Sequence, residues 1–349
     1  MKISIITVCL NSEKTIEQTI KSVLEQQYKD LEYIIVDGGS TDGTMDIVKK
    51  YDITKVISEP DNGLYDAMNK GIAMATGDVI GIINSDDWYE PDAFQVVAQK
   101  FSNNDVDILY GTTNGILIDK VVEVREPQEL WTMHYQMPFV HASVFVRKEI
   151  YDRYGVFDTT YRIAADCDIF LRWYTNSLRM KDAECTIANF SLDGLSAQQS
   201  GVGFEECFQI RKKYLEFAST EKKKEIQDIL DNQKVSHSFS LRLFDEKDNM
   251  NTLIDVVKNE KIVIYGAGKW GKQAQAKMEK SGVITHFFVD NNSEKWGTFL
   301  NGVEIKSPAD LQTFSGIVLV FVSKNTEEIM EQIIKLNNHN LKCITWKEL

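Results

Sequence analysis

Aspartate residues at three places in this sequence have the spacing and surroundings to carry out chemistry. Asp37 ends one apolar run, and the adjacent Asp86 and Asp87 end another. Asp166 and Asp168 precede the segment Ile-Phe-Leu-Arg-Trp, which is typical of a helix packed on a sheet. A carboxylate can accept a hydrogen bond from a nucleotide. An adjacent pair can hold a divalent cation that carries a substrate phosphate, and a further carboxylate can act as a general base.

Each of these aspartates also has a simpler structural interpretation. Asp37 is followed by Gly-Gly-Ser, residue types that favour tight turns whether or not a ligand binds. Asp86 and Asp87 can form an ordinary acidic turn in front of a helix. Asp166 and Asp168 can cap a helix, since negative charge is favoured at its N-terminus. No single aspartate therefore decides between a structural and a functional role.

The elements that must position these aspartates alternate between strand and helix. Runs of β-branched residues predict buried parallel strands, and the segments between them have apolar residues at helical spacing. This alternation predicts an α/β fold with a parallel, helix-covered sheet. Ligands bind such a sheet beyond the carboxyl ends of its strands, where Asp37 and the pair Asp86–Asp87 fall. The expected strands are 3–9, 31–36 and 79–83, and the expected helices are 12–26, 42–51 and 65–75.

Composition limits the class of protein. The 349 residues are 43% hydrophobic and 26% charged, as in an ordinary globular protein. The formal net charge of −13 argues against a nucleic-acid partner, which would need a basic face. Five cysteines without a CxxC pair indicate reduced thiols. The N-terminal segment does not resemble a signal peptide, and no run of about 18 apolar residues predicts a transmembrane helix. We therefore expect a cytoplasmic protein.

Taken together, five ordered motifs resemble the family 2 glycosyltransferases of the GT-A fold, especially those that build bacterial surface polysaccharides. The resemblance extends to about residue 200. It implies a GT-A nucleotide-sugar-binding domain with a Rossmann-like mixed sheet, and a metal-dependent, inverting transferase of the hexosyl or N-acetylhexosaminyl type. The matching stretches are Ser4–Asn11, Val36–Thr44, Asp61–Gly71, Asn84–Asp87, and Ala165–Asp168 followed by Leu171-Arg172.

The resemblance also implies roles for individual side chains around the donor. Thr7 and Asp37 would hold the nucleotide base, with Asp37 paired to an imide N–H as in uridine. Asp86 would contact the ribose or the outer shell of the metal. Asp87 would bind Mn²⁺ or Mg²⁺ directly, and the cation would neutralise the leaving diphosphate. Asp66 would lie near the donor, with a helix-cap role as the alternative.

The implied catalytic base lies where the sequence departs from the family pattern. Asp166 would take the proton from the attacking hydroxyl. The residue before it is Ala165, where Glu is usual, and this leaves the choice between Asp166 and Asp168 open. The metal motif also begins with Ser85, which is not acidic. His141 is interpreted as a structural histidine or, alternatively, as a contact to the acceptor or the diphosphate.

Three domains are expected along the chain. Residues 1–202 would form the GT-A catalytic domain. Residues 203–258 are polar and predict a helical connector. In residues 259–349, predicted strands and helices alternate again, and this pattern predicts a small Rossmann-like α/β domain.

The C-terminal region carries a complete GxGxxG motif. Gly266, Gly268 and Gly271 lie between a predicted strand and a predicted helix, and Asp290 ends the next strand. This context fits a second nucleotide site, with a pyrophosphate on the helix N-terminus and Asp290 on the ribose hydroxyls. A fold retained without a ligand, serving oligomerisation, is the alternative.

The leading functional interpretation is sugar transfer from a nucleotide-diphosphate sugar, UDP-linked by resemblance, to a hydroxyl of a glycan or lipid-linked acceptor. A lipid-linked acceptor would bring the protein peripherally to the inner face of the cytoplasmic membrane. The alternatives are an NAD(P)- or nucleotide-binding oxidoreductase or regulatory protein that acts through the C-terminal domain, and a catalytically inactive lectin-like module.

Overall fold

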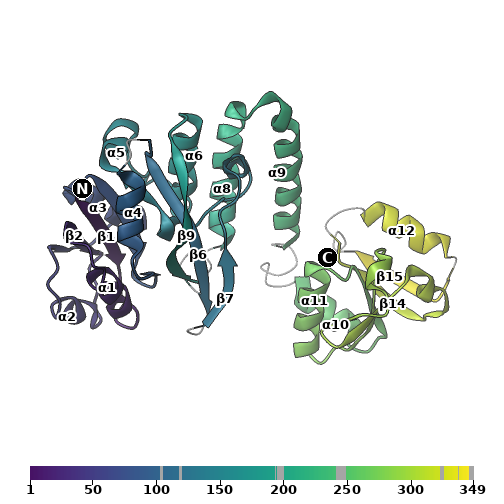
Figure 1. Ribbon diagram of the computed structural model, residues 1–349. Coiled ribbons are helices and arrows are strands. Elements are labelled where there is room, and N and C mark those ends of the chain that lie inside the picture. The colour runs from purple at the N-terminus through teal and green to yellow at the C-terminus, as the bar shows by residue number, and fades with distance from the viewer. Residues whose placement is uncertain are drawn as a thin grey trace. The chain divides into compact units, whose positions relative to one another are not determined.

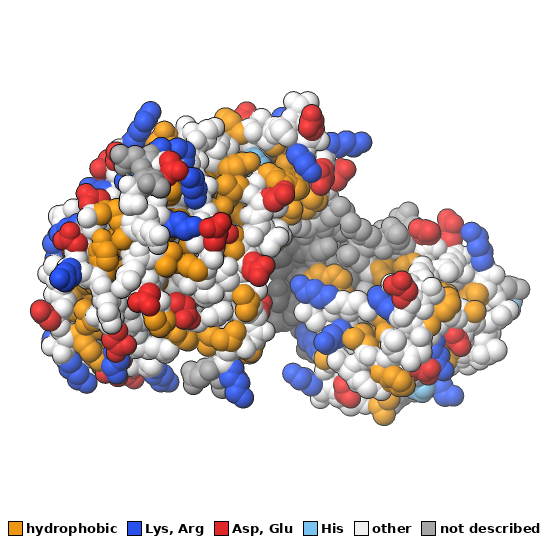
Figure 2. Space-filling view, viewed as in Figure 1, with side chains coloured by type: hydrophobic (Ala, Val, Ile, Leu, Met, Phe, Trp, Pro, Cys, Tyr) orange, Lys and Arg blue, Asp and Glu red, His pale blue; other side chains and the backbone are white. Residues whose placement is uncertain are grey.

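The chain folds into two compact units, residues 1–230 and 231–349, which are described separately. The computed structural model describes residues 1–102, 105–117, 120–192, 194, 200–240, 249–322, 326–336 and 338–345. Within this part of the chain, none of the helices combines the length and apolar character that a membrane crossing requires. On the face in view in Figure 2, acidic and basic side chains are interspersed.

The first unit is built on one mixed sheet with the strand order β3-β2-β1-β4-β8-β6-β9-β5, and β7 pairs with β6 (Figure 1). The first four of these strands are parallel, as the sequence predicts. Beyond β4 the sheet becomes mixed, because β8 runs antiparallel to both β4 and β6 while β9 runs parallel to β6. The strands are β1 Ile3–Cys9, β2 Leu31–Asp37, β3 Lys55–Ser58, β4 Val79–Asn84, β5 Trp88–Tyr89, β6 Ile108–Leu117, β7 Lys120–Arg125, β8 Phe145–Arg147 and β9 Met180–Ser191.

Helices cover both faces of this sheet. Because successive residues of a strand point to opposite faces, Ile6 and Val8 of β1 pack into one core while Ile3 and Ile5 pack into the other. Residues of α3 and α6 line the first core, and residues of α1 and α4 line the second. The helices are α1 Ile16–Leu24, α2 Thr44–Val48, α3 Leu64–Met74, α4 Ala93–Phe101, α5 Lys148–Tyr154 and α6 Ala165–Thr175.

The helices after the sheet also belong to the first unit over much of their length. Helix α8, Ser200–Tyr214, packs against α6 and buries Ile210 in the core of the first unit (Figure 1). Helix α9, Thr220–Ser240, contributes Ile226 and Leu230 to a smaller cluster with Phe208 of α8. The expected helical connector therefore starts with a helix that completes the core of the first unit. The domain boundaries proposed from the sequence stay a prediction.

The second unit is a smaller α/β domain with the strand order β12-β13-β11-β10-β14-β15. All its strand pairs are parallel except β12 with β13. The expected α/β organisation, with a mixed-sheet domain, helices and a second α/β domain, is confirmed. The elements are α10 Asn249–Val257, β10 Ile262–Tyr265, α11 Lys269–Lys280, β11 Thr285–Val289, β12 Phe299–Leu300, β13 Val303–Lys306, β14 Gly316–Val320, α12 Thr326–Lys335 and β15 Leu341–Thr345.

Candidate active site

Asp37 is the last residue of β2 and organises the turn that follows it. Its carboxylate accepts the backbone N–H groups of Gly39, at 3.2 Å, and Ser40, at 3.1 Å. It also accepts the hydroxyls of Ser40, at 2.5 Å, and Ser58, at 2.6 Å. Asp37 is fully buried, so its hydrogen bonds fix the shape of the Gly-rich turn. In the described structure, the carboxylate is engaged with the protein rather than exposed for a base N–H.

Thr7 lies on the adjacent strand β1 but does not bring its hydroxyl to the same edge. The side chain is fully buried, and its Oγ1 lies 3.0 Å from the hydroxyl oxygen of Tyr33. The structure therefore places Thr7 in the core between α1 and the sheet. A role for Thr7 in holding a nucleotide base stays a prediction, and it would require this hydroxyl pair to separate.

The segment before α3 lies over the Asp37 turn. A Cβ atom added at Gly38 would lie 2.4 Å from Oδ2 of Asp61, so the Asp61 carboxylate packs directly against the backbone of Gly38. Asp66 accepts the N–H of Asn62 at 3.0 Å and pairs with Lys70 at 3.4 Å. The Asn62 amide and Lys70 hold the pKa of Asp66 below its usual value. Asp66 therefore ties the start of α3 to the segment before it, and a contact with the donor stays a prediction.

Asp86 and Asp87 follow β4 as an uncompensated acidic pair. Burial raises the pKa of Asp86, and burial together with the Asp86 charge raises the pKa of Asp87 well above its usual value. Asp87 accepts the N–H of Ser191 at 2.9 Å and the side-chain amide of Asn84 at 3.3 Å. Across the described ranges, neither carboxylate forms an ion pair with a cationic side chain. Two carboxylates at a strand end fit a divalent cation that takes its other ligands from phosphate oxygens and water.

No larger metal-binding cluster is present in the described residues, where no group of three or more His, Cys, Asp or Glu residues could hold a metal ion. The pair Asp86–Asp87 would therefore hold a cation only together with ligands from substrate or water. Strand register places it beside the Asp37 turn, because Val8 of β1 pairs with Asn84 and Cys9 pairs with Asp37. The hydroxyls of Ser12 and Ser85, 2.7 Å apart, link the loops after β1 and β4.

Asp166 lies in the first turn of α6, beside the start of α3. Its Oδ1 accepts the N–H of Cys167 at 2.8 Å and the hydroxyl of Tyr65 at 3.4 Å. Neither of these bonds involves Oδ2. Burial raises the pKa of Asp166, which is the direction expected for a carboxylate that must accept a proton near neutral pH.

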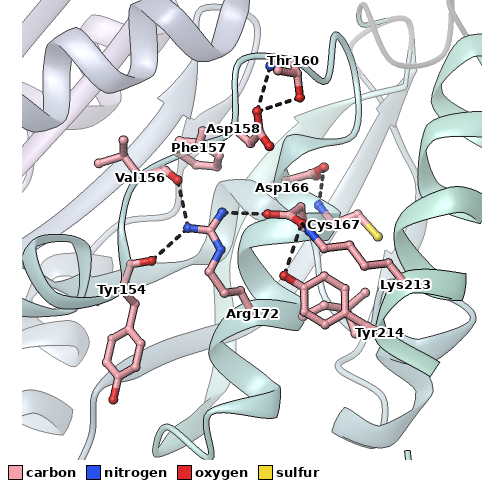
Figure 3. Close-up of polar contacts among 12 residues, drawn as sticks. Tyr154, Val156, Phe157, Asp158, Thr160, Asp166, Cys167, Arg172, Lys213 and Tyr214 are labelled. Carbon is pink, nitrogen blue, oxygen red and sulfur yellow. Dashed lines mark hydrogen bonds and ion pairs between the residues drawn. The ribbon is translucent and has the colours of Figure 1, made fainter. Parts of the chain in front are cut away.

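Asp168, two residues further along, is tied into a network of charges instead. Its Oδ2 lies 2.7 Å from Arg172, and its Oδ1 lies 3.2 Å from Lys213 and 3.3 Å from the Tyr214 hydroxyl. Figure 3 shows Arg172 also donating to the carbonyl oxygens of Tyr154 and Val156. Asp168 is buried and joins α6 to α8. This geometry favours a structural role for Asp168, and the assignment of Asp166 as the base stays a prediction.

His141 opens a short 3₁₀ turn, His141–Ser143, shortly before strand β8. Its ring packs beside Phe157 and Phe170, with centroids 6.0 Å away in both cases. Burial lowers the pKa of His141 to about 4, so the ring is neutral at physiological pH. Phe157 in turn stacks on Tyr65, which connects His141 to the surroundings of Asp166. These contacts support the structural interpretation of His141.

Two side chains of α8 lie beside this site, although no sequence motif indicated a role for them. Glu206 accepts three backbone N–H groups directly before α6. Arg211 is 9% exposed, and its Nε is buried without a hydrogen-bond partner. Its charge acts on Asp166, where it opposes the larger effect of burial on the pKa. The spacing of one helical turn between Cys207 and Arg211 places both residues on the same face of α8. Nothing local in the sequence predicts which surface that face packs against.

The Gly-rich loop of the second unit follows β10, as expected. Gly266 has a φ of +107°, and a Cβ at Gly271 would lie 2.0 Å from the carbonyl oxygen of Gly266, so the loop and α11 need both glycines. Asp290 accepts the N–H of Ala267 at 2.9 Å and pairs with Lys295 at 3.0 Å. Gly268 precedes α11 directly. The carboxylate proposed for ribose hydroxyls is thus bonded to the loop itself.

Comparison with known proteins identifies a family for each of the two units. The model of the family "Glycosyl transferase family 2" matches residues 4–182, and "C2185-like, N-terminal" matches residues 258–344. A PGL/p-HBAD biosynthesis glycosyltransferase of Mycobacterium tuberculosis is 29% identical over 180 residues, which are 50% of this chain and 70% of the relative. An uncharacterized glycosyltransferase of Nostoc sp. is 36% identical over 111 residues, 30% of this chain and 34% of the relative.

Solved structures show the same fold. S. aureus TarS in complex with UDP-GlcNAc has a TM-score of 0.57 and 19% identity, with 78% of this chain and 81% of TarS covered. The mannosyltransferase PcManGT from Pyrobaculum calidifontis, in complex with GDP-Man and Mn²⁺, has a TM-score of 0.51 and 18% identity, with 80% and 79% covered. The chain belongs to glycosyl transferase family 2. It is a nucleotide-sugar-dependent glycosyltransferase with a second α/β domain at its C-terminal end.

Proposed function

We propose that this glycosyltransferase moves a hexosyl or N-acetylhexosaminyl group from a UDP-sugar to a hydroxyl of a glycan or lipid-linked acceptor, with inversion at the anomeric carbon. The uncompensated carboxylate pair of Asp86 and Asp87 carries this proposal. Buried charges without partners are costly, so their retention at the ligand edge of the sheet supports a bound cation. That cation, Mn²⁺ or Mg²⁺, would be held by Asp87 with Asp86 near the ribose or the outer shell.

The role of the metal is to neutralise negative charge on the leaving diphosphate. PcManGT was crystallised with Mn²⁺ and a nucleotide sugar, which supports the same requirement here. The Asp37 turn would receive the nucleotide base, and Asp66 would order the α3 segment beside it. The UDP-GlcNAc complex of TarS supports a uridine donor.

Asp166 is the proposed base, because it is partly buried and lacks the ion pairs that occupy Asp168. Oδ2 of Asp166 would take the proton from the acceptor hydroxyl. In-line attack places that hydroxyl opposite the leaving diphosphate, so no sugar becomes attached to the enzyme. Arg211 would supply a positive charge to the bound substrates, since its unpaired Nε lies near Asp166.

The cellular setting follows from the resemblance. We propose surface-polysaccharide synthesis in the cytoplasm, at the inner face of the membrane if the acceptor is lipid-linked. The second domain would act in assembly. We propose no oxidoreductase activity, because Asp290 is bonded to Ala267 and Lys295 rather than directed to a ligand.

A donor screen tests the proposal without knowledge of the acceptor. Nucleotide sugars with uridine, guanosine and thymidine bases would be compared for divalent-dependent hydrolysis and for thermal stabilisation. We expect a UDP-sugar to give the strongest response, and we expect chelation by EDTA to remove it. A response that is independent of divalent cations, or one confined to NAD(P), would overturn the proposal.

A further inference from the structure

Glu206 of α8 lies against the turn that precedes the proposed base. Its Oε1 accepts the N–H of Arg162 at 2.8 Å, and its Oε2 accepts those of Ile163 at 2.9 Å and Ala164 at 3.0 Å. Three consecutive amides thus converge on one carboxylate. An anion held by successive backbone N–H groups is a strong arrangement, because each bond is assisted by the charge.

Helix α6 has no cap of its own at this end. Its N-cap residue is Ala164, which forms no side-chain capping hydrogen bond, and alanine is a poor N-cap. Ala165, the first helical residue, occupies the position where the family usually has Glu. The carboxylate of Glu206 comes from a different helix, about 40 residues later in the chain. It adds a negative charge beside the N-terminus of α6, whose first turn already holds Asp166 and Asp168.

The same turn is held from its other side by Tyr65. The Tyr65 hydroxyl lies 2.6 Å from the carbonyl oxygen of Ile163 and 3.4 Å from Oδ1 of Asp166. A Cβ added at Gly203 would lie 3.0 Å from the side chain of Ile163, so α8 approaches this turn closely at a glycine. Backbone amides on one side and a carbonyl on the other therefore fix the segment from which Asp166 projects.

We propose that Glu206 is a positioning residue for the reaction: by holding the amides of residues 162–164, it fixes the orientation in which Asp166 meets the acceptor hydroxyl. This proposal rests on the assignment of Asp166 as the base. It extends the catalytic apparatus to α8, in the region that the sequence suggests is only a connector. Glu206 itself touches neither the donor site nor the Asp166 carboxylate in the contacts described.

The test uses the full chain and the hydrolysis of the UDP-sugar that gives the highest rate in the donor screen, with water as the acceptor. Glu206→Ala removes the carboxylate, and Glu206→Gln keeps its shape and one acceptor oxygen. Glu205→Gln is the matched control, because Glu205 is exposed on the same helix and bonds to Gln209. Thermal unfolding of each variant establishes that it is folded.

We expect Glu206→Ala to lower kcat about 10²-fold, as for a reacting group displaced by about 1 Å. Glu206→Gln should lose less, and Glu205→Gln should match the parent. The KM for the donor should stay unchanged, because the donor contacts lie elsewhere. A loss confined to KM, or equal losses in the Glu205 and Glu206 variants, would overturn the proposal.

A double-mutant cycle separates positioning from general structural damage. If Glu206 acts through Asp166, Glu206→Ala should cost little further rate in the Asp166→Asn background. An equal fold-loss in both backgrounds would overturn the role of Glu206 while leaving Asp166 as the base. Full turnover of Asp166→Asn alone would instead overturn both the assignment of Asp166 as the base and this inference. The donor screen would still test the proposed transfer from a UDP-sugar independently.

Discussion

Arg172 and Asp168 form a buried ion pair one helical turn apart, with Nη2 of Arg172 2.7 Å from Oδ2 of Asp168. Lys213 of α8 reaches the other oxygen of the same carboxylate. Because Arg172 also donates to the carbonyl oxygens of Tyr154 and Val156, the pair joins α6 and α8 to the C-terminal end of α5 and the loop after it (Figure 3). The sequence does not distinguish Asp166 from Asp168 as the candidate base. The ion pair does, because it occupies the carboxylate of Asp168 and not that of Asp166.

Asp168→Asn should destabilise the first unit more than it affects the chemistry. Removing one partner of a buried pair costs about 3–5 kcal/mol, and the partial exposure of Lys213 and Arg172 lowers this to about 1–3 kcal/mol. Urea unfolding measures the loss, and donor hydrolysis at a temperature where the variant is folded measures turnover. Turnover that vanishes with unchanged stability would mean that Asp168, not Asp166, is the base.

Asp166→Asn should abolish transfer while leaving the donor bound. The amide keeps the size of the side chain but cannot accept the proton, so the rate should fall by about 10²–10⁴-fold. Titration with UDP in the presence of Mn²⁺ should give the parent affinity, because the Asp37 turn and Asp87 are untouched. Equal losses in affinity and rate would make Asp166 a binding residue.

The rate should depend on pH through the same carboxylate. Burial raises the pKa of Asp166, and a base works only when it is deprotonated. Activity should therefore be present above the raised pKa and fall as the pH drops through it, above the value of about 3.9 of an ordinary aspartate. Tyr65→Phe removes a hydrogen bond that favours the charged form of Asp166. The pH at which the rate falls should therefore move still higher. A pH–rate profile whose fall at acid pH is not shifted in Tyr65→Phe would contradict the assignment of Asp166 as the base.

Asp87→Asn should stabilise the protein when no metal is bound. Because the folded-state pKa of Asp87 is raised, the folded protein binds a proton more tightly than the unfolded chain does. Its stability then falls as the pH rises from about 3.9 through the raised value. At neutral pH in EDTA, the variant should melt about 2–4 °C higher for each kcal/mol of repulsion removed.

Metal binding should reverse this order of melting temperatures. Mn²⁺ with UDP should raise the melting temperature of the parent and leave Asp87→Asn unchanged, and the variant should not turn over. Differential scanning fluorimetry with and without Mn²⁺ measures both effects. A variant that responds to Mn²⁺ like the parent would exclude Asp87 from the metal site.

Asp290→Ala should loosen the Gly-rich loop of the second unit. It removes the acceptor of the Ala267 N–H and the partner of Lys295, at a cost of about 1–3 kcal/mol. Hydrogen exchange should show less protection at Ala267, and donor hydrolysis should not change. NAD(P) should not alter exchange in the parent. Protection of the loop by NAD(P) would restore the second nucleotide site.

The sequence by itself determined the elements of the sheet and the positions of the acidic motifs. Strand β1 was predicted at its observed bounds, because its apolar run is buried on both faces. The carboxyl ends of β2 and β4 follow from the same runs. Since parallel strands end at a common edge, the sequence also placed Asp37 beside Asp86 and Asp87.

Only the tertiary structure decided what each side chain does there. The Thr7 hydroxyl is turned to Tyr33, and the Asp37 carboxylate accepts the hydroxyl of Ser58, because face and partner depend on neighbours distant in the chain. The same holds for the two candidate bases. Asp166 and Asp168 are equivalent as helix-start aspartates in sequence, and they differ because α8 brings Lys213 to Asp168 and Glu206 to the turn before Asp166. Contacts of such long separation leave no local pattern, so sequence periodicity cannot reveal them.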